Sequence, residues 1–295
     1  MTSETQLREN PYTDLFIYYL QGRANHWAVN SFTDFLGNWE EDGYTFLFFS
    51  SPAKKQISDL LTRQPHLTLL DNYQMTYDDW QGGQLQPMQI GRFHIVPPWL
   101  AEATPMKSID PKQRILMDPG VVFGNGNHPT TRHCIEAIEL AFSHHRIDTA
   151  LDLGTGTGLL AIVAARLGCQ NCLALDLNHL AARTAQNNVA INGCDHQVLV
   201  VQGRAEAFID SRADLLIANI HYDVMRQLVR TRGFFEKQLF ILSGLLRSEV
   251  LDIQRILASC PVKILKKWEQ DTTWYTLLGE SASHNPAYRF NQEVS

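Results

Sequence analysis

No stretch of this 295-residue chain approaches the run of about 18 apolar residues that a membrane-spanning helix needs. Residues 1–6 are polar, and no signal-peptide core follows them. The net charge of −6 gives no overall basic surplus of the kind that nucleic-acid-binding domains carry. We therefore expect a cytoplasmic protein with no membrane partner and no direct nucleic-acid binding.

Five cysteines are too few in a chain of this length to form a disulfide framework. Cys169 and Cys172 form a C-x-x-C pair, but they follow an expected helix, whereas redox pairs stand at a helix N-terminus. No second pair has the spacing of a zinc site. We interpret both as buried structural thiols, and no metal site is predicted.

The segment from Leu151 to Asp176 is the most informative part of the chain. A short apolar run leads into Gly154-Thr-Gly-Thr-Gly158, a helix-like segment follows, and a second apolar run ends on Asp176. This order predicts half of a nucleotide-binding α/β sheet. The alternative is a tight turn that needs small residues and binds nothing.

The glycine spacing distinguishes between nucleotide classes. The dinucleotide fingerprint requires its third glycine where Leu159 stands. Asp152, two residues before the turn, would repel a pyrophosphate and attract a cationic ligand. S-adenosylmethionine has a sulfonium and an ammonium group and no phosphate, and Asp176 suits its ribose diol. The pattern therefore favours S-adenosylmethionine over a nicotinamide cofactor.

Composition divides the chain into four parts. We expect a small α+β domain over residues 1–72, a linker with an appended strand over 73–105, a regular α/β domain over 106–280 and a polar tail over 281–295. In the first part we expect strands at Asp14–Tyr19, Tyr44–Phe49 and His66–Leu70, and helices at Val29–Leu36 and Lys54–Thr62.

In the α/β part, strands and helices are expected to alternate. A loop over 123–131 precedes a helix that Thr130 or Thr131 can cap. Asn187 and Asn188 are expected to face solvent. The expected strands are 150–153, 172–175, 197–201, 213–218, 239–242, 262–267 and 273–278, and the expected helices are 158–167, 179–191, 222–235 and 246–258.

Taken together, four motifs resemble the bacterial ribosomal protein L-eleven methyltransferases. They are Phe-Gly-Asn-Gly-Asn-His-Pro-Thr-Thr over 123–131, Leu-Asp-Leu-Gly-Thr-Gly-Thr-Gly over 151–158, Asp-Leu-Leu-Ile-Ala-Asn-Ile over 214–220 and Ile-Leu-Ser-Gly-Leu over 241–245. The resemblance covers about residues 80–279 well and the N-terminal part weakly. It implies a Rossmann-like class I methyltransferase sheet of seven strands, the last antiparallel, with a small N-terminal α+β domain that recognises the substrate.

The resemblance also implies an activity. The family transfers methyl groups from S-adenosylmethionine to amino groups, a lysine side chain or the N-terminal amine, of ribosomal protein L-eleven. Residue by residue, the family's cofactor contacts match Thr131, Gly154, Asp176 and Asn219. Its loop over the methionine end matches Phe123, Gly124 and His128. The expected cofactor set also includes Asp152, Gly156 and Thr130.

Methyl transfer needs a neutral amine placed in line with the methyl group. The Asn219 side-chain carbonyl and the Ile220 backbone carbonyl are candidate acceptors that would aim the amine. His128 and His221 are candidate general bases, although a base is not obligatory. Each has a plainer alternative: His128 as a loop residue bonded to backbone, and His221 as a solvated rim residue.

The sequence departs from the family at two places. Asn125 and Asn127 replace the usual threonines, and His221, Tyr222 and Asp223 replace small apolar residues after Ile220. Three alternatives stay open. The first is the same chemistry on another protein or a small molecule. The second is an NAD-dependent oxidoreductase, which Leu159 and Asp152 disfavour, and the third is a binding module without turnover.

Overall fold

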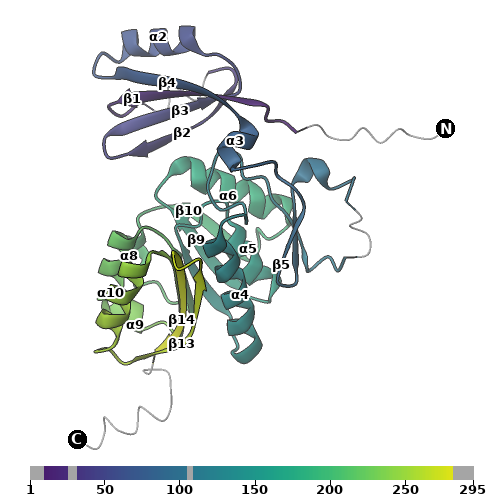
Figure 1. The fold of residues 1–295 in the computed structure, drawn as a ribbon, viewed down its shortest axis with the longest axis vertical. Coiled ribbons are helices and arrows are strands. Elements are labelled where there is room, and N and C mark those ends of the chain that lie inside the picture. Colours follow the sequence, from purple (N-terminus) through teal and green to yellow (C-terminus); the bar gives the residue numbers. More distant parts are fainter. Residues whose placement is uncertain (1–9, 26–31, 105–108, 282–295) are drawn as a thin grey trace, which may run out of the picture.

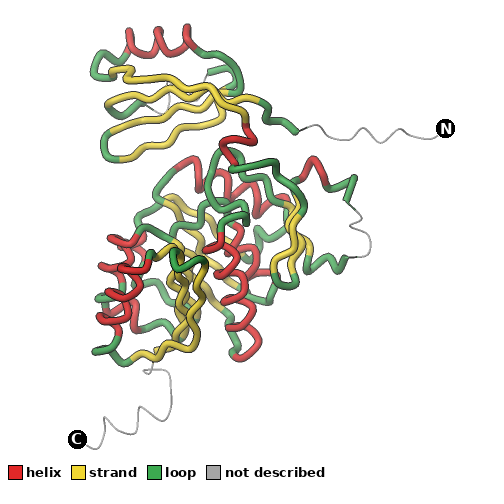
Figure 2. The backbone as a smooth tube through the Cα atoms, viewed as in Figure 1, coloured by secondary structure: helices red, strands yellow, loops and turns green. Residues whose placement is uncertain are grey.

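The computed structural model describes residues 10–25, 32–104 and 109–281, and they form a small four-stranded sheet and a larger seven-stranded sheet joined by a middle segment. Figure 1 shows the small sheet at one end of the molecule, with α3 (Tyr77–Gln81) between the two sheets. Figure 2 shows the two sheets as separate groups of yellow strands. The α/β fold and the separate N-terminal sheet confirm the predicted fold class.

The N-terminal sheet has the strand order β2-β3-β1-β4, and every pairing in it is antiparallel. One face packs under α2 (Lys54–Arg63) through buried residues such as Leu20, Leu47 and Leu60. The other face turns Leu15, Ile17 and Phe48 toward the larger domain. The strands are β1 (Asp14–Gln21), β2 (Phe35–Glu41), β3 (Tyr44–Phe49) and β4 (Thr68–Thr76).

The helix expected at Val29–Leu36 is wrong where the structure can be compared with it. Phe35 and Leu36 begin strand β2, while residues 29–31 lie outside the described residues. Asp42 and Gly43, both with positive φ (49° and 85°), turn β2 back onto β3. Such a turn matches the twist of a β-hairpin, so cross-strand pairing overrides the helical spacing of the apolar residues.

The middle segment carries α3, a three-stranded sheet and a short 3-10 helix (Pro98–Leu100). Strand β4 runs to Thr76, across the domain boundary expected after residue 72. The expected division of the chain into four parts stays a prediction. Trp80 in α3 lies with its ring 5.2 Å from Phe48 of the small sheet. The three strands are β5 (Met88–Ile90), β6 (Phe93–Val96) and β7 (Arg114–Leu116).

The large sheet has the strand order β10-β9-β8-β11-β12-β14-β13, and β14 runs opposite to the other six strands. Along β11 and β12, alternate residues face opposite sides: Leu215, Ile217 and Ile241 in one core, Leu216 and Phe240 in the other. Its strands are β8 (Thr149–Leu153), β9 (Asn171–Asp176), β10 (Val198–Gln202), β11 (Leu215–Asn219), β12 (Leu239–Leu245), β13 (Val262–Gln270) and β14 (Trp274–Ser281).

Helices cover both faces of this sheet (Figure 1), so it is buried as parallel sheets are. The helix expected over 222–235 is two helices, because the Thr231 hydroxyl accepts from the Phe234 amide and starts a new one. The helices are α4 (Pro129–His144), α5 (Leu159–Arg166), α6 (His179–Ile191), α7 (Ala205–Phe208), α8 (Tyr222–Leu228), α9 (Arg232–Phe235) and α10 (Arg247–Leu257).

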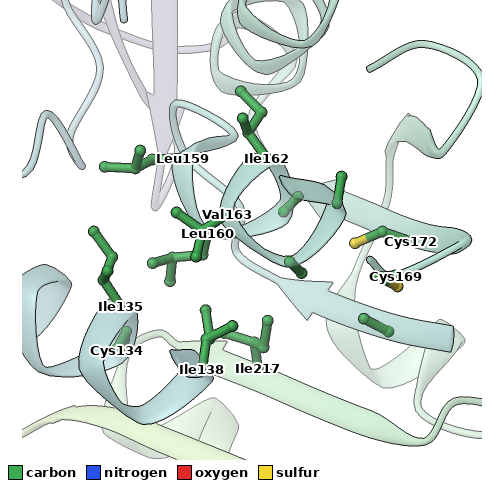
Figure 3. Close-up of a cluster of buried hydrophobic side chains, with 14 of the residues drawn as sticks. Cys134, Ile135, Ile138, Leu159, Leu160, Ile162, Val163, Cys169, Cys172 and Ile217 are labelled. Atoms are coloured by element: carbon green, nitrogen blue, oxygen red, sulfur yellow. The ribbon is translucent and has the colours of Figure 1, made fainter. Parts of the chain in front are cut away.

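Cys169 and Cys172 are buried free thiols beside α5, as Figure 3 shows. Burial raises the pKa of the Cys169 thiol to about 11 and raises the pKa of Cys172 well above its ordinary value. Reactive cysteines have lowered pKa values, so both act as small apolar side chains, as the sequence predicts.

Candidate functional site

A cleft of about 280 Å³ opens at the carboxyl ends of β8, β9 and β11, next to the point where the strand order reverses. Ligands of open α/β sheets bind in this position. Seven of the predicted site residues line it: Phe123, Gly154, Gly156, Asp176, Asn219, Ile220 and His221.

The turn between β8 and α5 forms the floor of the cleft. Gly154, Gly156 and Gly158 have φ values of 69°, 55° and 83°, which side chains rarely adopt. A Cβ atom on Gly154 would overlap Ile220, and one on Gly156 would lie 2.7 Å from the Phe123 carbonyl oxygen. The glycines let the turn, the β11 end and the Phe123 loop approach one another closely.

Asp176 closes one side of the cleft. Its Oδ2 accepts from the Gly156 amide at 3.0 Å, and its Oδ1 accepts from the Asn178 amide at 2.9 Å. Burial raises the pKa of this carboxyl group. Each carboxylate oxygen retains a second lone pair, so Asp176 holds the glycine turn in shape and can still accept from a ligand hydroxyl.

Asp152 lies beneath the cleft and is 1% exposed. Thr155 donates to its Oδ2 at 2.6 Å, while Oδ1 makes no close hydrogen bond among the described residues. Burial raises the pKa of Asp152 to about 7, although the Thr155 bond lowers it. The carboxyl group is therefore poised to ionise when a positive charge comes near.

Asn219 ends β11 at the mouth of the cleft. Its Nδ2 donates to the Thr130 hydroxyl at 3.4 Å, which joins the strand end to the start of α4. Thr130 is buried and its hydroxyl lies 2.7 Å from His128 Nδ1. Thr131, also buried, has no hydrogen-bond partner for its Oγ1 among the described residues.

His128, not Thr130 or Thr131, caps α4, so the cap predicted from the sequence is wrong. Its Nδ1 accepts from the Thr130 amide at 3.3 Å. Pro129 occupies the first helical position, which favours a helix start there. The imidazole ring packs 5.2 Å from Phe123 and 4.8 Å from Trp274, and burial lowers its pKa.

His128 and Gly124 line a second cavity, of about 400 Å³, on the other side of Phe123. His221 lies at the rim of the first cleft with 79% of its side chain exposed, and its Nδ1 is 3.7 Å from Asp223 Oδ2. The structure thus brings His221 to the cleft as a solvated rim residue and places His128 in the loop wall.

Sequence reasoning missed several residues of the site. Residues 203–206 follow β10 and line the cleft, and the strand-end rule applied to β10 would have identified them. Trp39 reaches the cleft from the N-terminal sheet, and no local sequence signal marks it. Asn188, expected to face solvent, is fully buried.

Within the described part of the chain, no three or more histidine, cysteine, aspartate or glutamate side chains gather in a way that could hold a metal ion. No described helix has the length and apolar character to cross a bilayer.

The strand order, the glycine turn and the acidic residue at the next strand end define a Rossmann-like domain of the class I methyltransferase type. The family profile described as Ribosomal protein L11 methyltransferase (PrmA) matches residues 48–282. The chain therefore belongs to this family, as the sequence motifs predict.

Individual relatives agree with the family assignment. A ribosomal protein L11 methyltransferase of Desulfitobacterium hafniense is 34% identical over 228 residues, 75% of this chain and 70% of that protein. One of Exiguobacterium sibiricum is 39% identical over 181 residues, 59% and 55% of the two chains. The crystal structure of a ribosomal protein L11 methylase from Lactobacillus delbrueckii superposes with a TM-score of 0.56 at 27% identity, covering 67% of this chain and 99% of that one.

Proposed function

We propose that this chain transfers methyl groups from S-adenosylmethionine to amino groups of ribosomal protein L11. The observation that carries the proposal is one cleft that combines a glycine turn, the acidic side chain of Asp176 and the amide of Asn219. The family's members are named for this activity. A ribosomal-protein substrate would make the cytoplasm the site of the reaction.

The residues of the cleft fit S-adenosylmethionine. Among the described residues, the buried Oγ1 of Thr131 and Oδ1 of Asp152 have no hydrogen-bond partner, and a ligand with donor groups would satisfy them. A charged ammonium group would favour the ionised form of Asp152. Asp176 lines the cleft, and its carboxylate can accept from ribose hydroxyls. Gly154 and Gly156 leave room for close approach. Phe123, Gly124 and His128 form the loop wall beside them, and Thr130 follows in the first turn of α4.

When bound, the cofactor supplies a methyl group on a positively charged sulfur, so the chain's own task is to orient the amine. Asn219 Oδ1 and the Ile220 carbonyl stand at the cleft mouth and can accept from an amine N–H. Two such acceptors would direct the nitrogen lone pair into the cleft, and positioning of this kind lowers the barrier to displacement.

Neither of the two candidate histidines is well suited to act as a base. His128 uses Nδ1 to cap α4, and His221 is largely exposed. An α-amine, with a reference pKa of about 7.7–8.0, is partly neutral at pH 7, whereas a lysine, at about 10.4, must lose its proton to water or to a desolvated site. We propose direct loss of the proton to solvent, with both histidines in structural roles.

We further propose that the N-terminal α+β domain, assigned to residues 1–72 with a linker over 73–105, holds the protein substrate. An apolar groove of about 540 Å³ separates its sheet from the Phe123 loop. Phe123 lines both the groove and the cofactor cleft, so a chain in the groove would pass the cleft mouth. The groove is lined by Ile17, Trp39, Glu41, Phe46, Phe48, Tyr73, Met75, Trp80, Val121 and Phe123.

The test is mass spectrometry of purified ribosomal proteins after incubation with this protein and isotope-labelled S-adenosylmethionine. We expect label on L11, and the fragment ions then identify the amine and the number of methyl groups. If S-adenosylhomocysteine binds but no ribosomal protein gains label, the assignment to L11 is wrong.

One observation favours a second candidate, the same methyl transfer to a different protein or small molecule. The exposed His221 lines the cleft and lies 3.7 Å from the exposed Asp223, and the sequence departs from the family at both residues. Label on another protein in the same experiment would favour this candidate. Binding of NAD in place of S-adenosylhomocysteine, measured by calorimetry, would favour the remote oxidoreductase alternative.

A further inference from the structure

Asn188 lies in α6 and is fully buried, with each polar atom of its side chain engaged. Its Nδ2 donates to the Thr157 carbonyl at 2.9 Å and to the Asp118 carbonyl at 2.8 Å. Its Oδ1 accepts from the Asp118 amide at 3.0 Å. Two carbonyl partners and one amide partner fix the orientation of the side-chain amide, because the flipped form would face oxygen with oxygen.

Asn192, one helical turn later, forms similar hydrogen bonds, but with the backbone of a single residue outside its own helix. Its Oδ1 accepts from the Leu116 amide at 2.9 Å, and its Nδ2 donates to the Leu116 carbonyl at 2.7 Å. Its remaining bond is to the Asn188 carbonyl in its own helix. Asn192 thus satisfies the backbone at the end of β7 and Asn188 that of Asp118 just after it, but only Asn188 also reaches the glycine turn.

From Thr157 the hydrogen bonds continue into the loop beside the cleft. The Thr157 hydroxyl donates to the Gly124 carbonyl at 2.7 Å. The next residue, Asn125, donates to Gln81 Oε1 at 2.8 Å. Gln81 ends α3, the helix between the two sheets (Figure 1).

The same bonds lead back to Asp118. Gln81 Nε2 donates to the Gly120 carbonyl at 2.8 Å, and the Gly120 amide donates to Asp118 Oδ1 at 3.0 Å. Asp118 Oδ2 also accepts from Tyr12, at 3.3 Å, and Tyr12 leads into β1 of the N-terminal sheet. These hydrogen bonds therefore join the glycine turn, the Phe123 loop and the joint between the domains, and Asn188 and Thr157 are their buried members.

We propose that Asn188 is a positioning residue for methyl transfer. It holds the glycine turn and the Phe123 loop in the relation that the cofactor cleft requires, and it ties both to the domain joint. Loss of its two donated bonds would let the turn move relative to Asp118 and widen the cleft. This inference deepens the proposed function and rests on it for the identity of the cofactor.

The test compares Asn188→Asp with the matched control Asn192→Asp. Each change keeps the shape of the side chain and an acceptor oxygen and removes at least one of its two donated bonds, because a carboxyl group carries one donor at most. Calorimetry with S-adenosylhomocysteine is run at a temperature where circular dichroism finds every variant folded, and steady-state kinetics give KM and kcat. We expect N188D to weaken S-adenosylhomocysteine binding and to raise KM for S-adenosylmethionine by about ten-fold, while N192D stays within about two-fold of wild type.

A merely structural role would lower thermal stability in both variants and leave cofactor affinity unchanged in both. Equal affinity of N188D and wild type, or equal loss in N188D and N192D, would overturn the inference. If N188D does not fold, Gln81→Ala is the test variant. It removes the two hydrogen bonds by which α3 joins the same network, and it should raise KM for S-adenosylmethionine about three-fold. An unchanged KM in Q81A would then overturn it. Failure of the wild type to bind S-adenosylhomocysteine would contradict the proposed function instead.

Discussion

At the scale of single residues, the charge of the buried Asp152 carboxyl group changes with pH near neutrality. The carboxyl group is 1% exposed, and desolvation raises its pKa to about 7. In the unfolded chain its pKa is about 3.9. Between these two values the folded protein binds one proton more than the unfolded chain, so the free energy of unfolding falls as pH rises through this window.

Asp152→Asn should remove this pH dependence. The isosteric amide can still accept from Thr155 and never ionises. Relative to D152N, the wild type should lose up to about 4 kcal/mol of unfolding free energy between pH 4 and pH 8, because each unit of pKa difference corresponds to about 1.4 kcal/mol. Urea unfolding of both proteins without cofactor, at several pH values, measures the difference. Parallel stability curves would show that Asp152 titrates normally.

Asn219→Ala should separate binding from turnover. The substitution removes the acceptor proposed to aim the amine, and a small misplacement of reacting groups costs about 100-fold in rate. We expect kcat to fall by about that factor. Because Asn219 also lines the cofactor cleft, S-adenosylhomocysteine affinity should fall too, but by much less, about three-fold. Asn171→Ala, an exposed position at the opposite end of β9, is the control and should change neither quantity. Full turnover in N219A with intact cofactor binding would exclude the role.

At the scale of secondary-structure elements, the start of α4 depends on an unusual cap. His128 caps the helix by accepting from the Thr130 amide at Nδ1, and its ring packs between Phe123 and Trp274. Removing a capping side chain costs about 1 kcal/mol, equivalent to about 2–4 °C in a domain of this size. His128→Ala should therefore lower Tm by a few degrees in a thermal scan. His128→Ser should recover most of it; an equal loss in both variants would mean that the ring contacts, not the cap, stabilise the loop.

The elements that the sequence predicted best are the central parallel strands and α6. Their apolar runs are bounded by glycine and asparagine, and Asn178 caps α6 by accepting from the Leu180 amide. The wrong predictions, for strand β2 and for Asn188, share one physical cause: contacts with residues far away in the sequence override the local spacing of apolar residues. Strand β2 forms because β3 pairs with it, and Asn188 is buried because the Asp118 backbone needs partners.

Sequence-based prediction of the candidate site had the same limit, because it could not foresee contacts between distant parts of the chain. The motifs predicted the residues on the cleft wall that belong to the large domain, because strand ends of one parallel sheet meet at one edge. They could not predict that Trp39 closes the cleft from the other domain, because that placement depends on how two sheets pack. Membership of the family was carried by motifs in the large domain, where 123–131 and 151–158 lie.

At the scale of the whole molecule, the small N-terminal sheet and the larger α/β part share a buried core. Leu15, Ile17 and Phe48 of the small sheet pack in one cluster with Val121 and Leu180 of the larger domain. Arg183 of α6 also donates to the Leu36 carbonyl at 2.7 Å. These contacts fix the small sheet beside the cleft, so the apolar groove and the cofactor cleft meet at Phe123.

This arrangement predicts that groove residues affect the protein substrate and not the cofactor. Tyr73 lies on β4, is 44% exposed and lines the groove but not the cleft. An aromatic anchor in an interface contributes about 1–2 kcal/mol, so Tyr73→Ala should raise KM for the protein substrate about ten-fold. S-adenosylhomocysteine affinity should not change. Leu70→Ala, exposed on the same strand but outside the groove, is the matched control. If Y73A and L70A have the same KM as wild type, the protein substrate docks elsewhere on the molecule, and the groove only separates the domains.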